Sequence, residues 1–254
     1  MVLAHELYGR GSEGVVVMHD FYGCKHTWDF ARNFFDVENF TFAFTELRGY
    51  GDSRNIQGQY TPEEAAADAI AVADNMGWDR FHIVGHSMSG MVAQRVMVDG
   101  GDRIKSAILN TPVHASGLKF APGGFEMIQD SLHDDKILYD AFDTLTGGRL
   151  CKEWMAFKSR QTRENRTREA QAAYLVNCRD QGFQSLADGN KTPTLIIVGE
   201  YDVEPFRQQD MEASLLKWYP NAQMTICRNA GHYPQQEAPV FVATVINEFL
   251  QRQL

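Results

Sequence analysis

Short apolar runs alternate along this chain with longer segments in which apolar residues recur at helical spacing. Six runs are strand candidates, because each is short and ends at polar or glycine residues. They are residues 15–18, 40–45, 81–84, 106–109, 194–198 and 224–227. Strands that alternate with helical segments are typical of a mostly parallel sheet covered by helices on both faces. The pattern therefore predicts an α/β fold with at least six strands.

Two segments carry clear helix signals. Thr61 can cap a helix that begins at Pro62, and Glu64 stands where its carboxylate can reach back to the capping amide. We expect this helix to run to Met76 and to end at Gly77, which can adopt the left-handed backbone that closes a helix. Near the end of the chain, six apolar residues form one helical stripe that should dock on the sheet: Phe241, Val242, Val245, Ile246, Phe249 and Leu250.

A long segment between the fourth and fifth strand candidates interrupts the alternation. It holds no good strand and is mostly compatible with helix. We expect residues 1–111 and 194–254 to form the core, and residues 112–193 to form an inserted helical cap. Within this cap, residues 149–179 hold eight basic side chains against three acidic ones. They indicate either a solvated helix face or an entrance that attracts anionic substrates.

Charge and composition narrow the class of protein. The 254 residues carry a formal net charge of −9, with 44% hydrophobic and 22% charged residues. These fractions are ordinary for a folded chain and argue against disorder. The excess of acid argues against binding to nucleic acid or to anionic lipid, because both are polyanions that need a basic surface. A small-molecule ligand is the expected partner, and the oligomeric state stays open between monomer and homodimer.

Three further features concern compartment and metals. The longest aliphatic runs are far shorter than the roughly 20 residues that cross a bilayer. The first residues show no basic start followed by an apolar run and a cleavage site, so we expect a cytoplasmic protein. Four cysteines lie far apart, which favours reduced thiols and gives no zinc-site spacing: Cys24, Cys151, Cys178 and Cys227.

A candidate nucleophile follows the third strand candidate. The sequence Gly85-His86-Ser87-Met88-Ser89-Gly90 leads from this strand into apolar residues at helical spacing. A turn of the G-x-S-x-G kind between a strand and a helix exposes its serine hydroxyl at the edge of the sheet. Ser87 is therefore the candidate, and it needs a histidine base with an orienting acid. We expect His86 to be structural, with its side chain beneath the turn.

The two partners that this serine needs occur later in the chain. Asp202 follows the fifth strand candidate, and His232 follows the sixth. The order Ser, Asp, His with both partners in loops after strands is the order of the α/β-hydrolase arrangement. We prefer Asp202 as the acid because its shorter side chain stands at the strand's edge, and Glu200 is the second choice.

The chain resembles the α/β-hydrolase family of esterase and lipase type. The motifs that carry the resemblance are HDFYG, ELRGYGDS, GHSMSG, GEYD and NAGH, which fall in the family's order from residue 15 to the last helix. The resemblance implies an α/β-hydrolase fold and an oxyanion hole made by the backbone N–H groups of Phe21 and Met88. It also implies hydrolysis without a metal or an organic cofactor.

Three positions depart from the family pattern. Asp20 stands where the family usually has glycine, and aspartate tolerates left-handed backbone better than most residues. Glu46 replaces an aspartate, which we expect to affect local hydrogen bonding only. Ser89 replaces the last glycine of the serine motif, and this form is similar to that of the strigolactone and karrikin receptor branch.

The function expected from these residues is a serine hydrolase that cleaves a small carboxylic ester or lactone through an acyl-enzyme. Hydrolysis of a carbon–carbon bond in a diketone, or of a thioester, can use the same triad. A ligand sensor on the hydrolase fold is an alternative of another class. Dehalogenase and epoxide hydrolase chemistry is disfavoured because related enzymes carry aspartate at the Ser87 position, and lyase chemistry because Tyr233 stands where hydroxynitrile lyases carry lysine. Five aromatic residues could line an acyl site or form the core of the cap: Trp28, Phe125, Phe142, Trp154 and Phe157.

Overall fold

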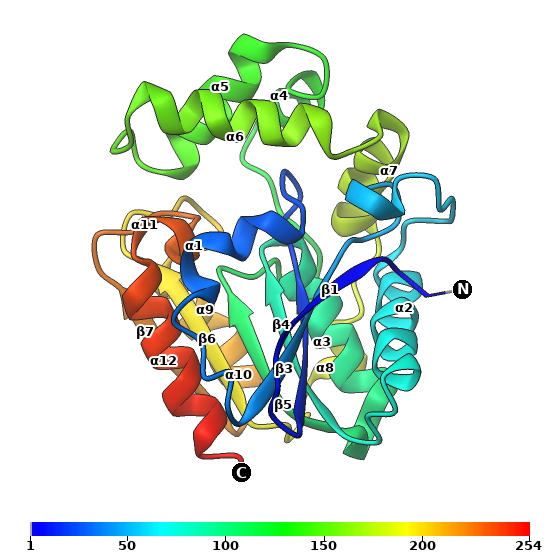
Figure 1. Ribbon diagram of the computed structural model, residues 1–254. Helices are drawn as coiled ribbons and strands as arrows, with labels where there is room; N and C mark the ends of the chain where they lie inside the picture. The colour runs from blue at the N-terminus through cyan, green and yellow to red at the C-terminus, as the bar shows by residue number, and fades with distance from the viewer. Residues whose placement is uncertain (1) are drawn as a thin grey trace.

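A seven-stranded sheet runs through the middle of the molecule in the order β1-β3-β2-β4-β5-β6-β7 (Figure 1). The computed structural model describes residues 2–254. The strands are β1 (His5–Gly9), β2 (Glu13–Met18), β3 (Phe40–Thr45), β4 (Phe81–His86), β5 (Ile104–Asn110), β6 (Thr194–Gly199) and β7 (Ala222–Cys227). Only β1 is antiparallel to its neighbour; the other pairs are parallel. The carboxyl ends of β2, β4, β6 and β7 therefore meet at one edge of the sheet.

The six strands expected from the sequence are all present, most of them a few residues longer than the apolar run that indicated them. Strand β1 was not expected. Its sequence HELYG has no apolar run, and its residues are half-buried or exposed, because this strand lies at the edge of the sheet and pairs with β3 alone. A strand that buries neither face gives no hydrophobic signal.

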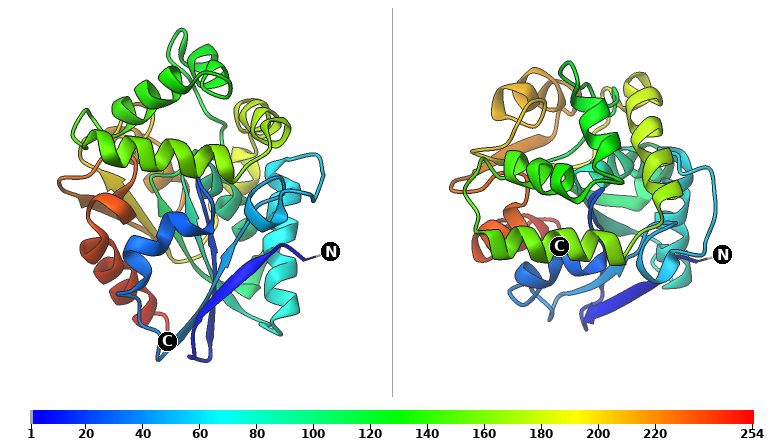
Figure 2. Two further views of the ribbon diagram at one scale, coloured as in Figure 1. Left: turned by 45° about the horizontal axis from the view of Figure 1, so that its top comes forward. Right: turned by 90° about the horizontal axis from the view of Figure 1, so that it is seen from above.

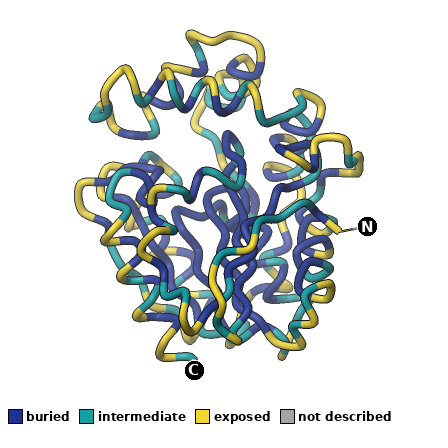
Figure 3. The backbone as a smooth tube through the Cα atoms, in the orientation of Figure 1, coloured by how far each residue is buried: buried dark blue, intermediate teal, exposed yellow. Residues whose placement is uncertain are grey.

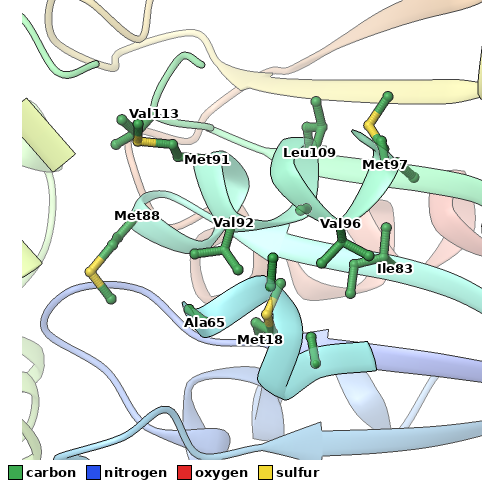
Figure 4. Close-up of a cluster of buried hydrophobic side chains, with 14 of the residues drawn as sticks. Met18, Ala65, Ile83, Met88, Met91, Val92, Val96, Met97, Leu109 and Val113 are labelled. Atoms are coloured by element: carbon green, nitrogen blue, oxygen red, sulfur yellow. The ribbon is translucent and has the colours of Figure 1, made fainter. Parts of the chain in front are cut away.

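Helices cover both faces of the sheet. One face carries α2 (Pro62–Asn75), α3 (Met88–Gly100), α8 (Gln184–Ala187), α9 (Gln208–Ala213) and α10 (Leu215–Trp218), and the other carries α1 (Asp29–Arg32), α11 (Pro234–Glu237) and α12 (Pro239–Gln251). Successive strand residues alternate between the two cores: Val16 packs with the first group and Val17 with the second. Figure 4 shows the first core, in which Met18 and Ile83 from the sheet lie with Val92 and Val96 from α3. Short 3₁₀ helices occupy residues 25–28, 51–53 and 101–103.

The two helices with clear sequence signals form close to their expected limits. Thr61 Oγ1 accepts a 3.1 Å hydrogen bond from the Glu64 amide, and Gly77 follows the helix with φ of 70°. The Glu64 carboxylate bonds to the amide of Tyr60 at 2.8 Å, one residue before the expected partner. In α12 four residues of the expected stripe are buried: Val242, Ile246, Phe249 and Leu250. Val245 is partly buried against the same core, and Phe241, in the first turn, is 41% exposed.

Four helices lie above the carboxyl edge of the sheet (Figures 1 and 2). We call them the cap helices: α4 (Gly124–Asp130), α5 (Asp135–Leu145), α6 (Lys152–Glu164) and α7 (Arg168–Asp180). Many of their residues are exposed, whereas the central strands β2, β3, β4, β5 and β6 below them are almost entirely buried (Figure 3). The whole chain between β5 and β6 contains no strand, as expected. Its last helix, α8, packs against α3 in the core layer, so the expected limits of 112–193 for the cap stay a prediction.

The chain enters and leaves the cap helices through two segments that run side by side. The Phe183 amide donates to the Ala115 carbonyl oxygen at 2.7 Å, and the Leu118 amide donates to the Cys178 carbonyl oxygen at 2.7 Å. Gly117 adopts φ of 89°, and a Cβ there would lie 2.6 Å from the Arg179 carbonyl oxygen. This pairing forms a narrow stem below the cap helices.

All four cysteines carry free thiols: Cys24, Cys178 and Cys227 are buried, and Cys151 is exposed. Among residues 2–254, none of the helices combines the length and the apolar character that crossing a bilayer requires.

Candidate active site

Ser87 stands on a sharp turn between β4 and α3. Its backbone has φ of 54° and ψ of −115°, a conformation that non-glycine residues rarely adopt. Two backbone hydrogen bonds, both 2.9 Å long, fix this turn against the end of β5 and the segment that follows it. The Ser87 amide donates to the Asn110 carbonyl oxygen, and the Ser87 carbonyl oxygen accepts from the Val113 amide. A Cβ on Gly85 would lie 2.1 Å from the Ser89 carbonyl oxygen, so the close approach of α3 requires glycine there. This is the strand–turn–helix geometry of a nucleophile elbow.

The structure brings Ser87, His232 and Asp202 together as the sequence predicts. His232 Nε2 lies 2.8 Å from Ser87 Oγ, and His232 Nδ1 lies 2.9 Å and 3.1 Å from the two carboxylate oxygens of Asp202. All three residues are less than 10% exposed. The Asp202 carboxylate also accepts a 2.8 Å hydrogen bond from the Val203 amide, which fixes its orientation. The arrangement can move a proton from the serine hydroxyl to an oriented imidazole.

Glu200, the second choice for the acid, points elsewhere. It is exposed, and its carboxylate accepts a 3.1 Å hydrogen bond from the Asn229 amide. It therefore stabilises the turn before the histidine and makes no contact with the imidazole. Of the two acids that follow β6, only Asp202 reaches His232.

The loop that carries His232 is fixed by side chains from several elements. His86 Nε2 lies 2.7 Å from the His232 carbonyl oxygen, which also accepts from Thr111 Oγ1 at 3.1 Å. His86 is fully buried beneath the serine turn, and burial lowers its pKa. The Glu237 carboxylate accepts from the amides on both sides of His232, at 2.9 Å and 3.1 Å. Nothing in the sequence around Glu237 marked this role, since a glutamate in a short helix is usually solvated.

The two backbone groups expected to form an oxyanion hole lie beside Ser87. Both Phe21, after β2, and Met88, at the start of α3, line the same cavity as Ser87 and His232. Within residues 2–254, neither the Phe21 N–H nor the Met88 N–H donates to another protein group. The Phe21 carbonyl oxygen accepts from the Tyr50 hydroxyl at 2.9 Å, which restrains the orientation of its peptide. Two free amides beside a nucleophile can stabilise negative charge that develops on a substrate oxygen.

Asp20 does not use the left-handed backbone that its place in the sequence suggested. It is absent from the residues with positive φ, and its side chain explains its presence instead. The carboxylate is 1% exposed, and it accepts from the Tyr22 amide at 2.9 Å and from Thr27 Oγ1 at 3.1 Å. Burial alone would raise the pKa of Asp20, but the nearby Lys158 ammonium and His86 imidazole hold that pKa well below its usual range. Asp20 is therefore a buried, paired carboxylate and not a residue with strained backbone.

Two further ionisable groups are buried next to this loop. Burial lowers the pKa of His19 to about 4, so its Nε2 stays unprotonated and accepts from the Leu47 amide at 3.2 Å. Burial raises the pKa of Glu46 to about 7. Its carboxylate accepts a 3.2 Å hydrogen bond from the Lys25 amide.

A cavity of about 260 Å³ opens above Ser87 and His232. Its walls come mainly from the cap helices, the stem and the loops after β6 and β7, and they are chiefly apolar: Leu118, Phe120, Met127, Ile128, Leu145 and Phe206. None of the eight basic residues in 149–179 lines it. Lys119, at the exposed rim, is the one basic side chain among its lining residues besides His232.

The five aromatic residues proposed for an acyl site do not line this cavity. Trp28 packs in the core against the sheet, while Phe142 and Trp154 form part of a small cap core with Tyr22 and Tyr233. Aromatic residues that do line the cavity include Phe21, Phe120 and Phe206, and the Phe206 ring lies 4.4 Å from the His232 ring between centroids. The periodicity of a helix shows which face is apolar but not whether that face meets a cavity or a core.

Among residues 2–254, no group of three or more His, Cys, Asp or Glu side chains is placed to hold a metal ion.

The sequence matches a known family over most of its length. The family model described as "Alpha/beta hydrolase family" matches residues 15–245. A dihydrolipoyllysine-residue acetyltransferase component of an acetoin cleaving system from Pseudomonas putida is 24% identical over 97% of this chain, which spans 66% of that relative's length. A putative 2-succinyl-6-hydroxy-2,4-cyclohexadiene-1-carboxylate synthase from Bacillus subtilis (strain 168) is 24% identical over 95% of this chain and 91% of the relative.

A third curated relative is a 2-hydroxymuconate semialdehyde hydrolase from Pseudomonas putida, which is 28% identical over 81% of this chain and 75% of its own length. Among solved structures, an esterase from Exiguobacterium antarcticum superposes with a TM-score of 0.85 at 14% identity, covering 98% of this chain and 95% of that one. A thermophilic esterase from Thermogutta terrifontis has a TM-score of 0.82 at 23% identity, covering 99% and 93%. At these identities the superpositions establish a shared fold.

Proposed function

Because the chain belongs to the alpha/beta hydrolase family, we propose that it is a serine hydrolase that cleaves small, neutral carboxylic esters or lactones through an acyl-enzyme. The observation that carries the proposal is the continuous hydrogen-bonded chain from Ser87 Oγ through His232 to Asp202 at the base of an apolar cavity. Ser87 has a strained backbone conformation and lines a cavity. Both features favour a catalytic role for the three side chains, because a purely structural role requires neither.

In the first half of the reaction, Ser87 Oγ attacks the carbonyl carbon while His232 Nε2 takes the hydroxyl proton. Asp202 keeps the other imidazole proton on Nδ1, so Nε2 is free to accept. The carbonyl oxygen becomes an oxyanion that the Phe21 and Met88 N–H groups receive, each worth about 3 kcal/mol of barrier. Collapse of the tetrahedral intermediate expels the alkoxide, which takes the proton from His232 and leaves the acyl group on Ser87.

In the second half, water attacks the acyl carbon. His232 Nε2 takes a proton from this water, and a second tetrahedral oxyanion forms in the same pair of N–H groups. Its collapse breaks the bond to Ser87 Oγ, which regains its proton from His232. The products are a carboxylic acid and an alcohol, and a lactone gives one hydroxy acid.

The walls of the cavity support a neutral substrate. An anionic group buried there would lose its hydration, and among the lining residues only rim-located Lys119 could compensate its charge directly. The basic residues of the cap are engaged elsewhere: Arg149 pairs with Glu237 at 2.6 Å and Arg163 with Asp135 at 2.7 Å. They do not form an anion site above Ser87.

Cleavage of a carbon–carbon bond is the second candidate. It is supported by the relative whose name is 2-hydroxymuconate semialdehyde hydrolase, which matches 81% of this chain. The same triad can attack the carbonyl carbon of such a substrate. The apolar lining favours the ester over this candidate, because a muconate carries a carboxylate that the cavity does not pair.

A turnover screen tests the proposal. Wild type and Ser87→Ala are compared on short and long p-nitrophenyl esters, lactones, acyl thioesters, and a vinylogous diketone with and without a carboxylate. We expect turnover of neutral esters or lactones and labelling by a fluorophosphonate in the wild type, and loss of both in Ser87→Ala with unchanged circular dichroism. Labelling or turnover retained by folded Ser87→Ala would refute the role of Ser87. Ligand binding with turnover far below about one per second on every substrate would favour a sensor instead.

A further inference from the structure

The segment Asp20–Tyr22, which we call the oxyanion loop, is held from above by side chains of the cap helices. Lys158 Nζ of α6 lies 3.4 Å from Asp20 Oδ2, and Thr162 Oγ1, one turn later, donates to the Tyr22 carbonyl oxygen at 2.7 Å. From α7, Gln171 Nε2 donates to the Phe21 carbonyl oxygen at 3.0 Å. Every residue of the loop therefore has a polar contact with a cap helix.

The charged member of this set is an ion pair without access to water. Lys158 and Asp20 are 0% and 1% exposed. The ammonium has two other close neighbours, Gln161 Oε1 at 3.3 Å and the face of the Tyr233 ring, whose centroid is 4.7 Å away. Lysine is rarely buried unless it is paired with an opposite charge. Lys158 of α6 is therefore buried inside the molecule and packs against the oxyanion loop.

The partner of this lysine controls the geometry of the loop. Asp20 Oδ1 accepts from the Tyr22 amide at 2.9 Å, a side-chain bond that closes a turn around Phe21. The other carboxylate oxygen faces Lys158, Thr27 and, from below, His86 Nδ1 at 3.5 Å. The orientation of the Asp20 carboxylate therefore fixes the two peptides that flank Phe21, and with them the direction of the Phe21 N–H.

We propose that Lys158 is a positioning residue, which acts through Asp20 to hold the Phe21 N–H toward the substrate oxyanion, so that the oxyanion hole is complete only when α6 is seated on the core. This inference rests on the proposed function, because it assigns a partner to one of its two oxyanion donors. Lys158 does not line the cavity, so it acts through the loop and not on the substrate. The cap helix α6 thereby takes part in assembling the catalytic groups without lining the cavity.

The experiment compares Lys158→Met with Lys152→Met. Both lysines belong to α6, but Lys152 is 81% exposed and has only a 3.9 Å contact with Glu153. Hydrolysis of p-nitrophenyl butyrate by Lys158→Met is expected to show a kcat lower by roughly 10- to 100-fold with KM within about twofold, because a small displacement of a catalytic group has such an effect. Lys152→Met should keep both constants.

Inhibition separates the oxyanion hole from general damage. Trifluoromethyl propyl ketone adds to Ser87 and places an oxyanion in the hole, whereas methyl propyl ketone binds without forming one. In Lys158→Met the inhibition constant of the trifluoromethyl ketone should rise by about the factor by which kcat/KM falls. The inhibition constant of the methyl ketone should not change. In the double variant Asp20→Asn with Lys158→Met, the amide oxygen keeps the Tyr22 contact without a buried charge, so kcat should recover to within about fivefold of wild type.

Thr162→Val provides a second route if Lys158→Met does not fold. It removes the hydrogen bond to Tyr22 from the same helix without a change of charge, and we expect kcat to fall with KM unchanged. Folded variants at Lys158 or Thr162 with wild-type kcat, or with both ketones weakened equally, would overturn the inference. Failure of the proposed function has another signature: the wild type itself would neither hydrolyse the ester nor react with a fluorophosphonate.

Discussion

Ser89 Oγ donates a 2.5 Å hydrogen bond to the carbonyl oxygen of His19. Ser89 lies in the first turn of α3, and His19 is the residue after β2, immediately before the oxyanion loop. Both residues are fully buried. The serine that replaces the family's last motif glycine thus joins the helix that follows the proposed nucleophile, Ser87, to the strand that leads to Phe21, a proposed oxyanion donor. A glycine could not make this connection.

Ser89→Ala is predicted to lower the free energy of unfolding by about 1 to 2 kcal/mol, because the buried His19 carbonyl oxygen loses this donor. Urea unfolding followed by fluorescence measures the change. Ser159→Ala is the matched control, since Ser159 Oγ is buried without a hydrogen-bond partner among the described residues. Equal stability of the Ser89 variant and the wild type would show that this hydrogen bond contributes nothing.

The two acids after β6 give a matched pair for catalysis. Asp202→Asn should reduce kcat by about 10³- to 10⁴-fold, because an amide in place of the carboxylate no longer holds the required tautomer of His232. Glu200→Gln should stay within about twofold of wild type, since Glu200 contacts only the Asn229 amide. Steady-state kinetics on the best ester from the turnover screen provide the test. A large loss in Glu200→Gln together with an active Asp202→Asn would reverse the assignment of the acid.

Stability is predicted to fall on acidification because of buried histidines. His82 in β4 is fully buried with Nδ1 2.8 Å from Ser106 Oγ, and burial is the main cause that lowers its pKa from 6.5 to about 4. Between these values the unfolded chain binds a proton that the folded protein does not. The stability contributed by neutral His82 is therefore present above about pH 6.5 and is lost as the pH falls toward 4, by up to about 3 kcal/mol.

His82→Gln should make the fall in unfolding free energy between pH 7 and pH 4.5 shallower. His19 and His114 have pKa values lowered to about 4 by the same cause, so the fall is reduced and not abolished. Glu46, whose pKa is raised to about 7, adds stability as the pH falls. This contribution is the same in wild type and in His82→Gln, so it cancels when their pH profiles are compared. His133→Gln, on the exposed surface, is the control. Parallel pH profiles for wild type and His82→Gln would contradict the prediction.

The strands and the triad could be predicted because their signals are local. A buried parallel strand is an apolar run, and the residues after β4, β6 and β7 stand next to such runs, so Ser87, Asp202 and His232 could be placed on one edge of a sheet. Glu200 and Asp202 were separated by side-chain length and strand position alone. The structure adds the reason, because the backbone turn directs Glu200 to Asn229.

The contacts between the cap helices and the core could not be predicted in this way. Lys158 belongs to a run of basic residues in a helix, a pattern typical of a solvated face, and its burial depends on the tertiary position of α6 over Asp20. The same holds for the cavity walls, where Phe120 and Phe206 lie and Phe142 and Trp154 do not. A sequence pattern shows that a residue is polar or apolar, and only packing decides which partner it meets.

The chain leaves the core at Ala115 and re-enters it at Phe183, and these two residues are hydrogen-bonded neighbours in the stem. This geometry suggests that the cap helices could be replaced as one segment. A chimera that exchanged everything between these points for the corresponding segment of another family member would keep the sheet and the triad. It would also remove Lys158, Thr162 and Gln171 from above the oxyanion loop. Recombination at this site is therefore not expected to transfer a substrate preference alone, since a donor segment that fills the cavity but brings no cation against Asp20 should yield a protein that binds ligands and turns them over poorly.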